Sequence, residues 1–197
     1  MRAENVSDAR FHILGLTGSL RRGSFNTGLL RVAQELAPDG VEIEIADISA
    51  IPLYNEDLNR EGGPAPVQAL KQRAREADAL LFATPEYNYS MTGVQKNLID
   101  WLSRPLETTP LRHKPVAMMG AGGMFGTVRS QLALRQVFLF TESYAMINPQ
   151  LMIMRSSEYF DAEGRLLDEA LRQRVRMIVE GLVAWTQQIS PREGREA

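Results

Sequence analysis

The chain has 197 residues, of which 44% are apolar and 23% charged, the balance of one globular domain rather than of a disordered segment. It has no cysteine and only two histidines, His12 and His113, which excludes a disulfide framework, a thiol nucleophile, a thiolate zinc site and a multi-histidine metal centre. The net charge of −2 gives no support for a nucleic-acid partner. No apolar run reaches the ~18–20 residues that span a bilayer, and the first ten residues lack the apolar core of a signal peptide. We therefore expect a cytoplasmic protein without a membrane partner.

Short apolar segments alternate along the chain with longer segments of helical spacing, and a polar loop covers 49–63. Since parallel neighbours need crossover connections, which are right-handed, the alternation predicts an α/β fold: a doubly wound five-stranded parallel sheet with helices on both faces. We expect one domain over residues 1–197, with its core at about 10–188. The predicted strands are 11–16, 41–45, 79–84, 116–119 and 145–147, and the predicted helices are 26–37, 67–76, 94–102, 128–140 and 167–185.

The loop after the first predicted strand reads TGSLRRGSFN and precedes a helix. In such sheets the ligand lies beyond the carboxyl ends of the strands, where unpaired amides at a helix N-terminus favour a phosphate. Ser19, Ser24 and Asn26 add side-chain donors and Arg21 adds a positive charge. The alternative is that Ser24 or Asn26 only caps the helix.

The loops after the third and fourth predicted strands also carry unusual residues. The first of them, PEYNYSMTG (85–93), supplies two aromatic rings, an amide and a hydroxyl, which suit a flat heteroaromatic ring. Its alternative is a turn whose tyrosines pack at a subunit contact. The second, GAGGMFG (120–126), has more glycines than packing needs and favours close approach of a ligand to the backbone; its alternative is a tight turn.

The remaining candidates have structural interpretations. The methionines at 118, 119, 152 and 154 are expected in the core of strands. Asp100 and Arg104 stand four residues apart on a predicted helix, as a surface ion pair would. The two histidines complete no nucleophile–histidine–carboxylate set, so we expect no catalytic side chain and no metal ligand.

Taken together, the three loops resemble the NAD(P)H-dependent FMN reductase family of flavodoxin-like proteins, which includes chromate, quinone and azo-dye reductases. The matching segments are GSLRRGSFN (18–26), PEYNYS (85–90) with Gly93, Lys96-Asn97 and Asp100-Trp101, and the glycine loop followed by Arg129 and Leu134-Arg135-Gln136. Gln95 and Gly122 depart from the family, which more often has an apolar residue and a serine there.

The resemblance implies FMN as cofactor and NADPH or NADH as electron donor. It implies that Ser19, Arg21, Ser24 and Asn26, in a loop shared with Phe25, hold the FMN phosphate. It further implies that Pro85, Glu86, Tyr87 and Asn88 contact the isoalloxazine ring, and that the backbone near Ala121 and Gly122 closes the pyrimidine end of that ring.

The expected function is an FMN-dependent oxidoreductase that passes electrons by a ping-pong mechanism to small-molecule acceptors: quinones, azo compounds, metal oxyanions or flavin. The alternatives are a flavodoxin-type electron carrier and an FMN-binding interaction protein without its own NADPH turnover. Relatives commonly assemble as homodimers or homotetramers, and Tyr89, Trp101 and the helix carrying Asp100 and Arg104 offer groups enriched at interfaces.

Overall fold

The computed structural model describes residues 11–189. The expectation about the first ten residues lies outside this range. The strands are β1 (Phe11–Thr17), β2 (Val41–Ile45), β3 (Ala79–Ala83), β4 (Pro115–Ala121), β5 (Tyr144–Ala145) and β6 (Leu151–Ile153). The helices are α1 (Phe25–Glu35), α2 (Glu56–Arg60), α3 (Ala65–Glu76), α4 (Gly93–Leu102), α5 (Val128–Phe140) and α6 (Glu169–Ile189), and two single 3₁₀ turns cover Leu106–Thr108 and Ser156–Glu158.

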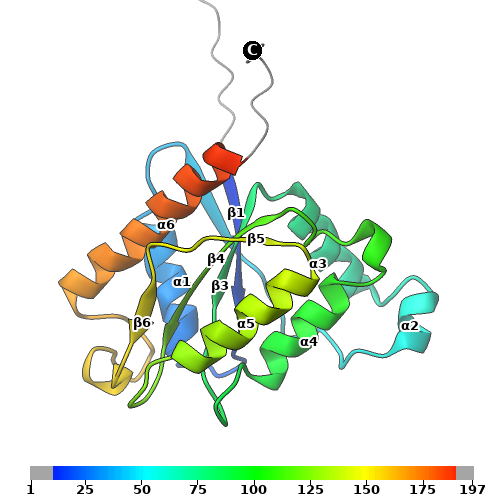
Figure 1. Cartoon of the computed structure of the whole chain (residues 1–197). Coiled ribbons are helices and arrows are strands. Elements are labelled where there is room, and N and C mark those ends of the chain that lie inside the picture. The colour runs from blue at the N-terminus through cyan, green and yellow to red at the C-terminus, as the bar shows by residue number, and fades with distance from the viewer. Residues whose placement is uncertain (1–10, 190–197) are drawn as a thin grey trace, which may run out of the picture.

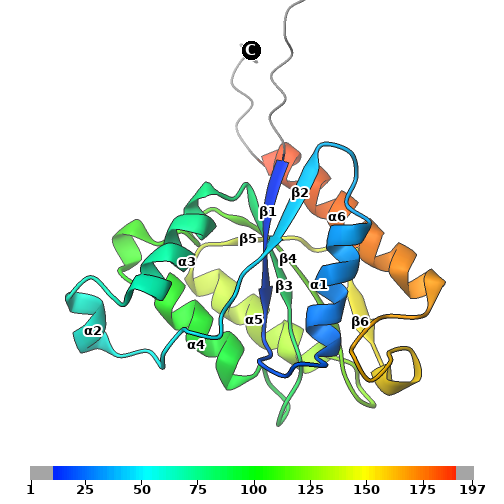
Figure 2. The same cartoon turned by 180° about the vertical axis from the view of Figure 1, so that it is seen from behind.

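The strands form one sheet in the order β2-β1-β3-β4-β5, with β6 also paired to β4, and every pair is parallel. Helices α1 and α6 cover one face, and α3, α4 and α5 cover the other (Figures 1 and 2). Strands β3 and β4 are buried at every residue, since helices cover both of their sides. The edge strand β2 has the sequence VEIEI, which places Ile43 in the core and exposes Glu42. The doubly wound parallel fold is thus confirmed.

Two apolar clusters, one on each face, hold the helices to the sheet. The first joins Ile13, Leu29 and Val179 from β1, α1 and α6, and the second joins Leu80 and Leu98 from β3 and α4 with their neighbours. Both clusters lie along the length of the strands. Ser19, Arg21, Glu86 and Tyr87, which follow β1 and β3 at the carboxyl edge, belong to neither cluster, so their side chains are available for a ligand or another partner.

The structure corrects four details of the sequence-based expectation. The fifth strand is split into β5 and β6, because the chain leaves the sheet at residues 146–150, around Pro149, and then returns to β4. The segment predicted as a loop over 49–63 contains α2, which Asn55 caps by accepting from the Asp57 amide at 2.9 Å. Met154 is 57% exposed and so does not belong to the core. Asp100 pairs at 2.5 Å with Lys96, one turn earlier, rather than with Arg104.

Trp101 does not have the interface role that was expected for it. Its side chain is fully buried, and its indole N–H donates to the Pro52 carbonyl at 2.8 Å. Trp101 therefore belongs to the interior of the subunit, whereas Tyr89 is 70% exposed. Within residues 11–189, no helix is both long and apolar enough to cross a bilayer.

Candidate functional site

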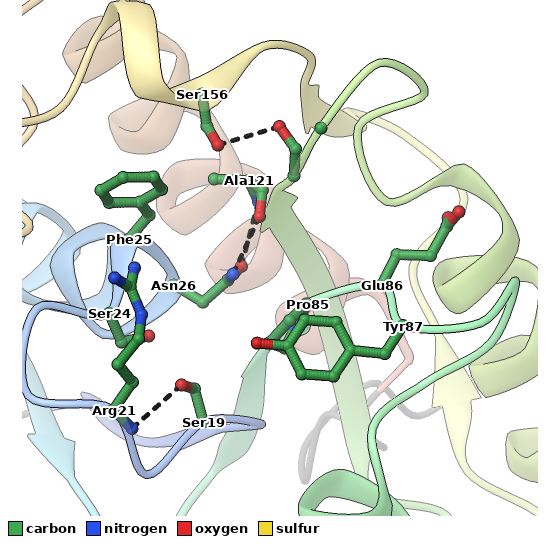
Figure 3. A pocket seen from close by; sticks show the side chains of 12 residues that line it. Ser19, Arg21, Ser24, Phe25, Asn26, Pro85, Glu86, Tyr87, Ala121 and Ser156 are labelled. Atoms are coloured by element: carbon green, nitrogen blue, oxygen red, sulfur yellow. Dashed lines mark hydrogen bonds between the residues drawn. The ribbon is translucent and has the colours of Figure 1, made fainter.

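A pocket opens beyond the carboxyl ends of β1, β3 and β4, at the edge where the fold places a ligand. It has a cavity volume of about 190 Å³. Figure 3 shows its side chains converging from the loops after β1, β3 and β4, with Ser156 added from the turn after β6. The lining residues are Ser19, Arg21, Ser24, Phe25, Asn26, Pro85, Glu86, Tyr87, Ala121, Gly122, Gly123 and Ser156.

The first wall is the loop between β1 and α1. Ser24 is the N-cap of α1, and its hydroxyl oxygen accepts from the Thr27 amide at 3.3 Å. Upstream, the Arg21 amide donates to the Ser19 hydroxyl at 3.2 Å, which fixes the turn. The predicted cap at Ser24 is therefore present, and its O–H proton stays available to a ligand because the cap uses only a lone pair.

The Arg21 guanidinium lies over the ring of Phe25, with Cζ 5.0 Å from the ring centroid. Phe25 in turn stacks on Phe160, with ring centroids 4.7 Å apart. This support comes from the segment after β6, which the sequence analysis did not connect with the site. Within the described chain, Arg21 forms no ion pair with a carboxylate, so its charge is available at the pocket.

Asn26 bridges the first and third walls. Its Nδ2 donates to the Ala121 carbonyl at 2.9 Å and its Oδ1 accepts from the Ala121 amide at 3.0 Å (Figure 3). Both residues are buried, at 4% and 3% exposure. One Nδ2 proton is left for a ligand, but the main structural effect of Asn26 is to tie α1 to the end of β4.

The second wall is a tight turn after β3. Tyr87 and Ser90 exchange two backbone hydrogen bonds of 3.0 Å, and Asn88 and Tyr89 between them have φ of 52° and 66°. Two successive positive φ values are the geometry of a type I′ turn. The Tyr87 ring reaches toward the pocket (Figure 3) and is 62% exposed. The turn of the alternative interpretation is thus present, and it also forms a pocket wall, while the subunit contact of its tyrosines stays a prediction.

The carboxylate of Glu86 points away from the pocket (Figure 3) and binds the start of α5. Oε2 accepts from the backbone amides of Arg129 and Ser130 at 2.9 and 3.3 Å, and Oε1 pairs with the Arg129 guanidinium, with Nε at 2.5 Å. Helix α5 has no cap from its own N-cap residue, Thr127. Glu86 therefore supplies that cap, and its side chain has a structural role.

Packing accounts for most glycines of the third wall. A Cβ on Gly122 would meet the Gly126 carbonyl oxygen at 2.1 Å, and Gly126 itself turns the chain with φ of +59°. Gly123, in contrast, faces open space and lines the pocket. The Gly122 carbonyl accepts from the backbone amide and the hydroxyl of Ser156, each at 2.9 Å. A tight turn is therefore the better explanation of this loop, with close approach of a ligand limited to Gly123.

Ten of the eleven predicted site residues line this one pocket. The exception, Asn88, lines an adjoining pocket of about 340 Å³ that shares Glu86 and Gly123 with the first. In the adjoining pocket the Arg129 guanidinium lies between two rings, with Cζ 3.7 Å from the Tyr89 centroid and 4.6 Å from the Phe125 centroid. The two pockets adjoin at Glu86 and Gly123 along the carboxyl edge of the sheet, and together they are called the crevice below.

Sequence reasoning missed Gly123 and Ser156 as lining residues. Ser156 follows β6, a strand that lies beyond the fifth predicted strand at 145–147 and was not expected. The usable signal was the second apolar stretch, Leu151–Ile153, after Pro149.

The doubly wound sheet and a crevice walled by a helix N-cap, an arginine and an aromatic turn define a flavodoxin-like protein. The family model of the NADPH-dependent FMN reductases matches residues 11–158, and the chain belongs to that family. The chain is therefore an oxidoreductase, as expected from its sequence. The family is the one that the three loops resemble.

Individual relatives agree with this assignment. The chain is 49% identical over 178 residues to an NAD(P)H-dependent FMN reductase of Pseudomonas aeruginosa, which covers 90% of this chain and 96% of that protein. It is 44% identical to an NAD(P)H:quinone oxidoreductase of Solanum tuberosum, over 87% of this chain and 91% of that protein. The solved structure of the flavoenzyme FerB from Paracoccus denitrificans, an NAD(P)H:(acceptor) oxidoreductase, superposes with a TM-score of 0.78 at 33% identity, covering 90% and 97% of the two chains.

Proposed function

We propose that this chain is an NAD(P)H:quinone oxidoreductase that holds FMN in the crevice at the carboxyl edge of its sheet. The observation that carries the proposal is the convergence of a phosphate-type loop and an aromatic turn on one pocket. The Ser19 and Ser24 hydroxyls, the Arg21 guanidinium and the amides at the start of α1 would hold the phosphate. The donor set fits this anion because the one carboxylate among the lining residues, Glu86, is paired with Arg129 and turned away (Figure 3).

The other end of the crevice fits a flat ring. Pro85 and Tyr87 form one side of it, and the backbone of Gly123, where a Cβ would meet no atom within 4 Å, forms the other. Asn26, which the resemblance assigns to the phosphate, acts in our proposal by holding Ala121 in place. Gly122 is likewise held by Ser156, so these two residues shape the wall from behind.

FMN would supply the redox chemistry there: hydride acceptance from the nicotinamide and electron delivery to the acceptor. The chain contributes binding and orientation, and no side chain is assigned as acid or base. The adjoining pocket, lined by Tyr89, Phe125 and the Arg129 guanidinium that contacts both rings, would give a flat partner an exposed surface beside the ring end of the first pocket. Since donor and acceptor would both need this space, they would use it in turn, which is a ping-pong mechanism.

Quinones are the favoured acceptors because the relative from Solanum tuberosum carries that name. Azo compounds, metal oxyanions and free flavin belong in the same panel as competing acceptors.

We also propose that the chain forms a homodimer or homotetramer. The support is the exposure of the apolar residues Leu132, Leu139 and Phe140 on α5. We further propose a cytoplasmic location, where nicotinamide nucleotides are supplied.

The test is turnover by the purified protein. We expect yellow protein with one FMN per chain that oxidises NADPH rapidly when a benzoquinone is added, followed at the nicotinamide absorbance band. Protein that stays colourless after incubation with FMN would contradict the cofactor proposal. Protein that binds FMN but oxidises neither NADPH nor NADH would support the electron-carrier alternative.

A further inference from the structure

A second cavity, unconnected with the crevice, lies between α2 and α3. Figures 1 and 2 both show α2 at the side of the molecule away from α1 and α6. The cavity has a volume of about 650 Å³, and its lining includes three basic side chains, Arg60, Lys71 and Arg75, with no acidic residue. Lys71 and Arg75 are four residues apart on α3, so they share a helix face.

Lys71 is the central residue of this cavity. It is only 6% exposed, and its ammonium group donates to Asn59 Oδ1 at 3.2 Å and lies 5.8 Å from the centroid of the Trp101 ring. These contacts leave two of its three N–H donors without an acceptor. Burial lowers the pKa of Lys71, and the neighbouring charge of Arg75 lowers it further.

Two of the three cations of the cavity, Lys71 and Arg75, have no carboxylate partner in the part of the chain that the structure describes. The third, Arg60, is paired with Glu56 only at 3.5 Å. A buried charge is normally paired, because moving it out of water without a partner costs several kcal/mol. Lys71 and Arg75 line one cavity that has no acidic residue. An anion bound there would supply the missing negative charge through charge-assisted hydrogen bonds.

We propose that this cavity is a binding site for a phosphate-bearing anion, held by Lys71 and Arg75 with Arg60 at the rim. Asn59 adds an amide: its Oδ1 accepts from Lys71, and its Nδ2 donor is free to face the anion. A cavity of this size accepts more than a single phosphate, so the ligand is either a free polyphosphate or a phosphate ester. The site is independent of the flavin crevice, since the two share no lining residue.

Calorimetric titration of the FMN-saturated protein tests this site, because the bound cofactor fills the crevice and its phosphate loop. Inorganic pyrophosphate and ADP are titrated at constant ionic strength in the absence of nicotinamide nucleotides. We expect saturable binding of at least one of them with one site per chain. Tighter pyrophosphate binding would identify a free anion, and tighter ADP binding would identify an ester.

The variants Lys71→Met and Arg75→Gln should each weaken that binding by at least about tenfold. Met is unbranched and close to lysine in length, so it removes the charge with little change in side-chain volume. Arg75 is exposed, so Arg75→Gln decides the question if circular dichroism shows Lys71→Met to be misfolded. Arg31→Gln removes one exposed charge from α1 and is the matched control, with an expected change below about twofold. The proposal would be overturned if neither pyrophosphate nor ADP bound saturably at concentrations up to about 10 mM. It would also be overturned if Arg31→Gln weakened binding as much as the cavity variants did, or if Arg75→Gln bound the ligand as tightly as the unchanged protein.

Discussion

Replacing Arg21 by alanine separates binding of the phosphate from binding of the ring. The guanidinium lies at the pocket over Phe25 and has no carboxylate partner in the described part of the chain, so no internal ion pair competes with a ligand. A charge-assisted contact to a phosphate contributes about 1.5–3 kcal/mol, which predicts that Arg21→Ala weakens FMN binding by about 10–100-fold. Riboflavin, which lacks the phosphate, should lose less than about threefold.

Flavin fluorescence quenching measures both dissociation constants on the protein stripped of flavin. Arg22→Ala is the matched control, because Arg22 is also exposed and adjacent in sequence but does not line the pocket. It should weaken FMN by less than about twofold. Equal weakening of FMN and riboflavin by Arg21→Ala would show that Arg21 supports the loop through Phe25 and does not contact the phosphate.

Three further predictions concern the clamp, the kinetics and the assembly. Asn26→Ala should lower the free energy of unfolding by about 2–4 kcal/mol in urea, since two hydrogen bonds are lost and the buried Ala121 amide and carbonyl are left unpaired; a change below about 0.5 kcal/mol would refute the clamp. Double-reciprocal plots of NADPH oxidation at several quinone concentrations should be parallel, and intersecting lines would show that donor and acceptor bind together. Light scattering should report two or four times the 22.1 kDa chain mass at micromolar concentration, and a value near that of one chain would exclude the proposed assembly.

The sequence was sufficient for the fold and for the two main walls of the site. The loops over residues 17–26 and 85–93 stand out in the sequence because polar residues and glycines directly follow the apolar residues of a buried strand. In a parallel sheet all such segments meet at the same edge. Local pattern therefore implied long-range proximity without any knowledge of contacts.

What the sequence could not show is which polar atoms are already used. Asn26 and Glu86 have the chemistry of ligand-binding residues, but their partners, Ala121 and Arg129, lie 95 and 43 residues away. The prediction that a ligand approaches the backbone at the glycine loop was wrong at Gly122 for a similar reason. The group that approaches Gly122 closely is the protein's own backbone at Gly126. The glycines of this loop indicate that some atom lies close to its backbone, but only the packing in the folded structure shows which atom it is.

The bridge from Asn26 to Ala121 also restricts how the crevice can admit a large molecule. It fastens the walls that follow β1 and β4, the two strands on either side of β3, to each other. Separating those two walls would break two buried hydrogen bonds at once. The turn at Tyr87–Ser90 has its two backbone hydrogen bonds within itself and meets the α5 side of the site through the contact of Arg129 with the exposed Tyr89 ring. A ligand would therefore enter and leave on the side of Tyr87. A substitution of Tyr87 should change the association and dissociation rates of the ligand more than its dissociation constant.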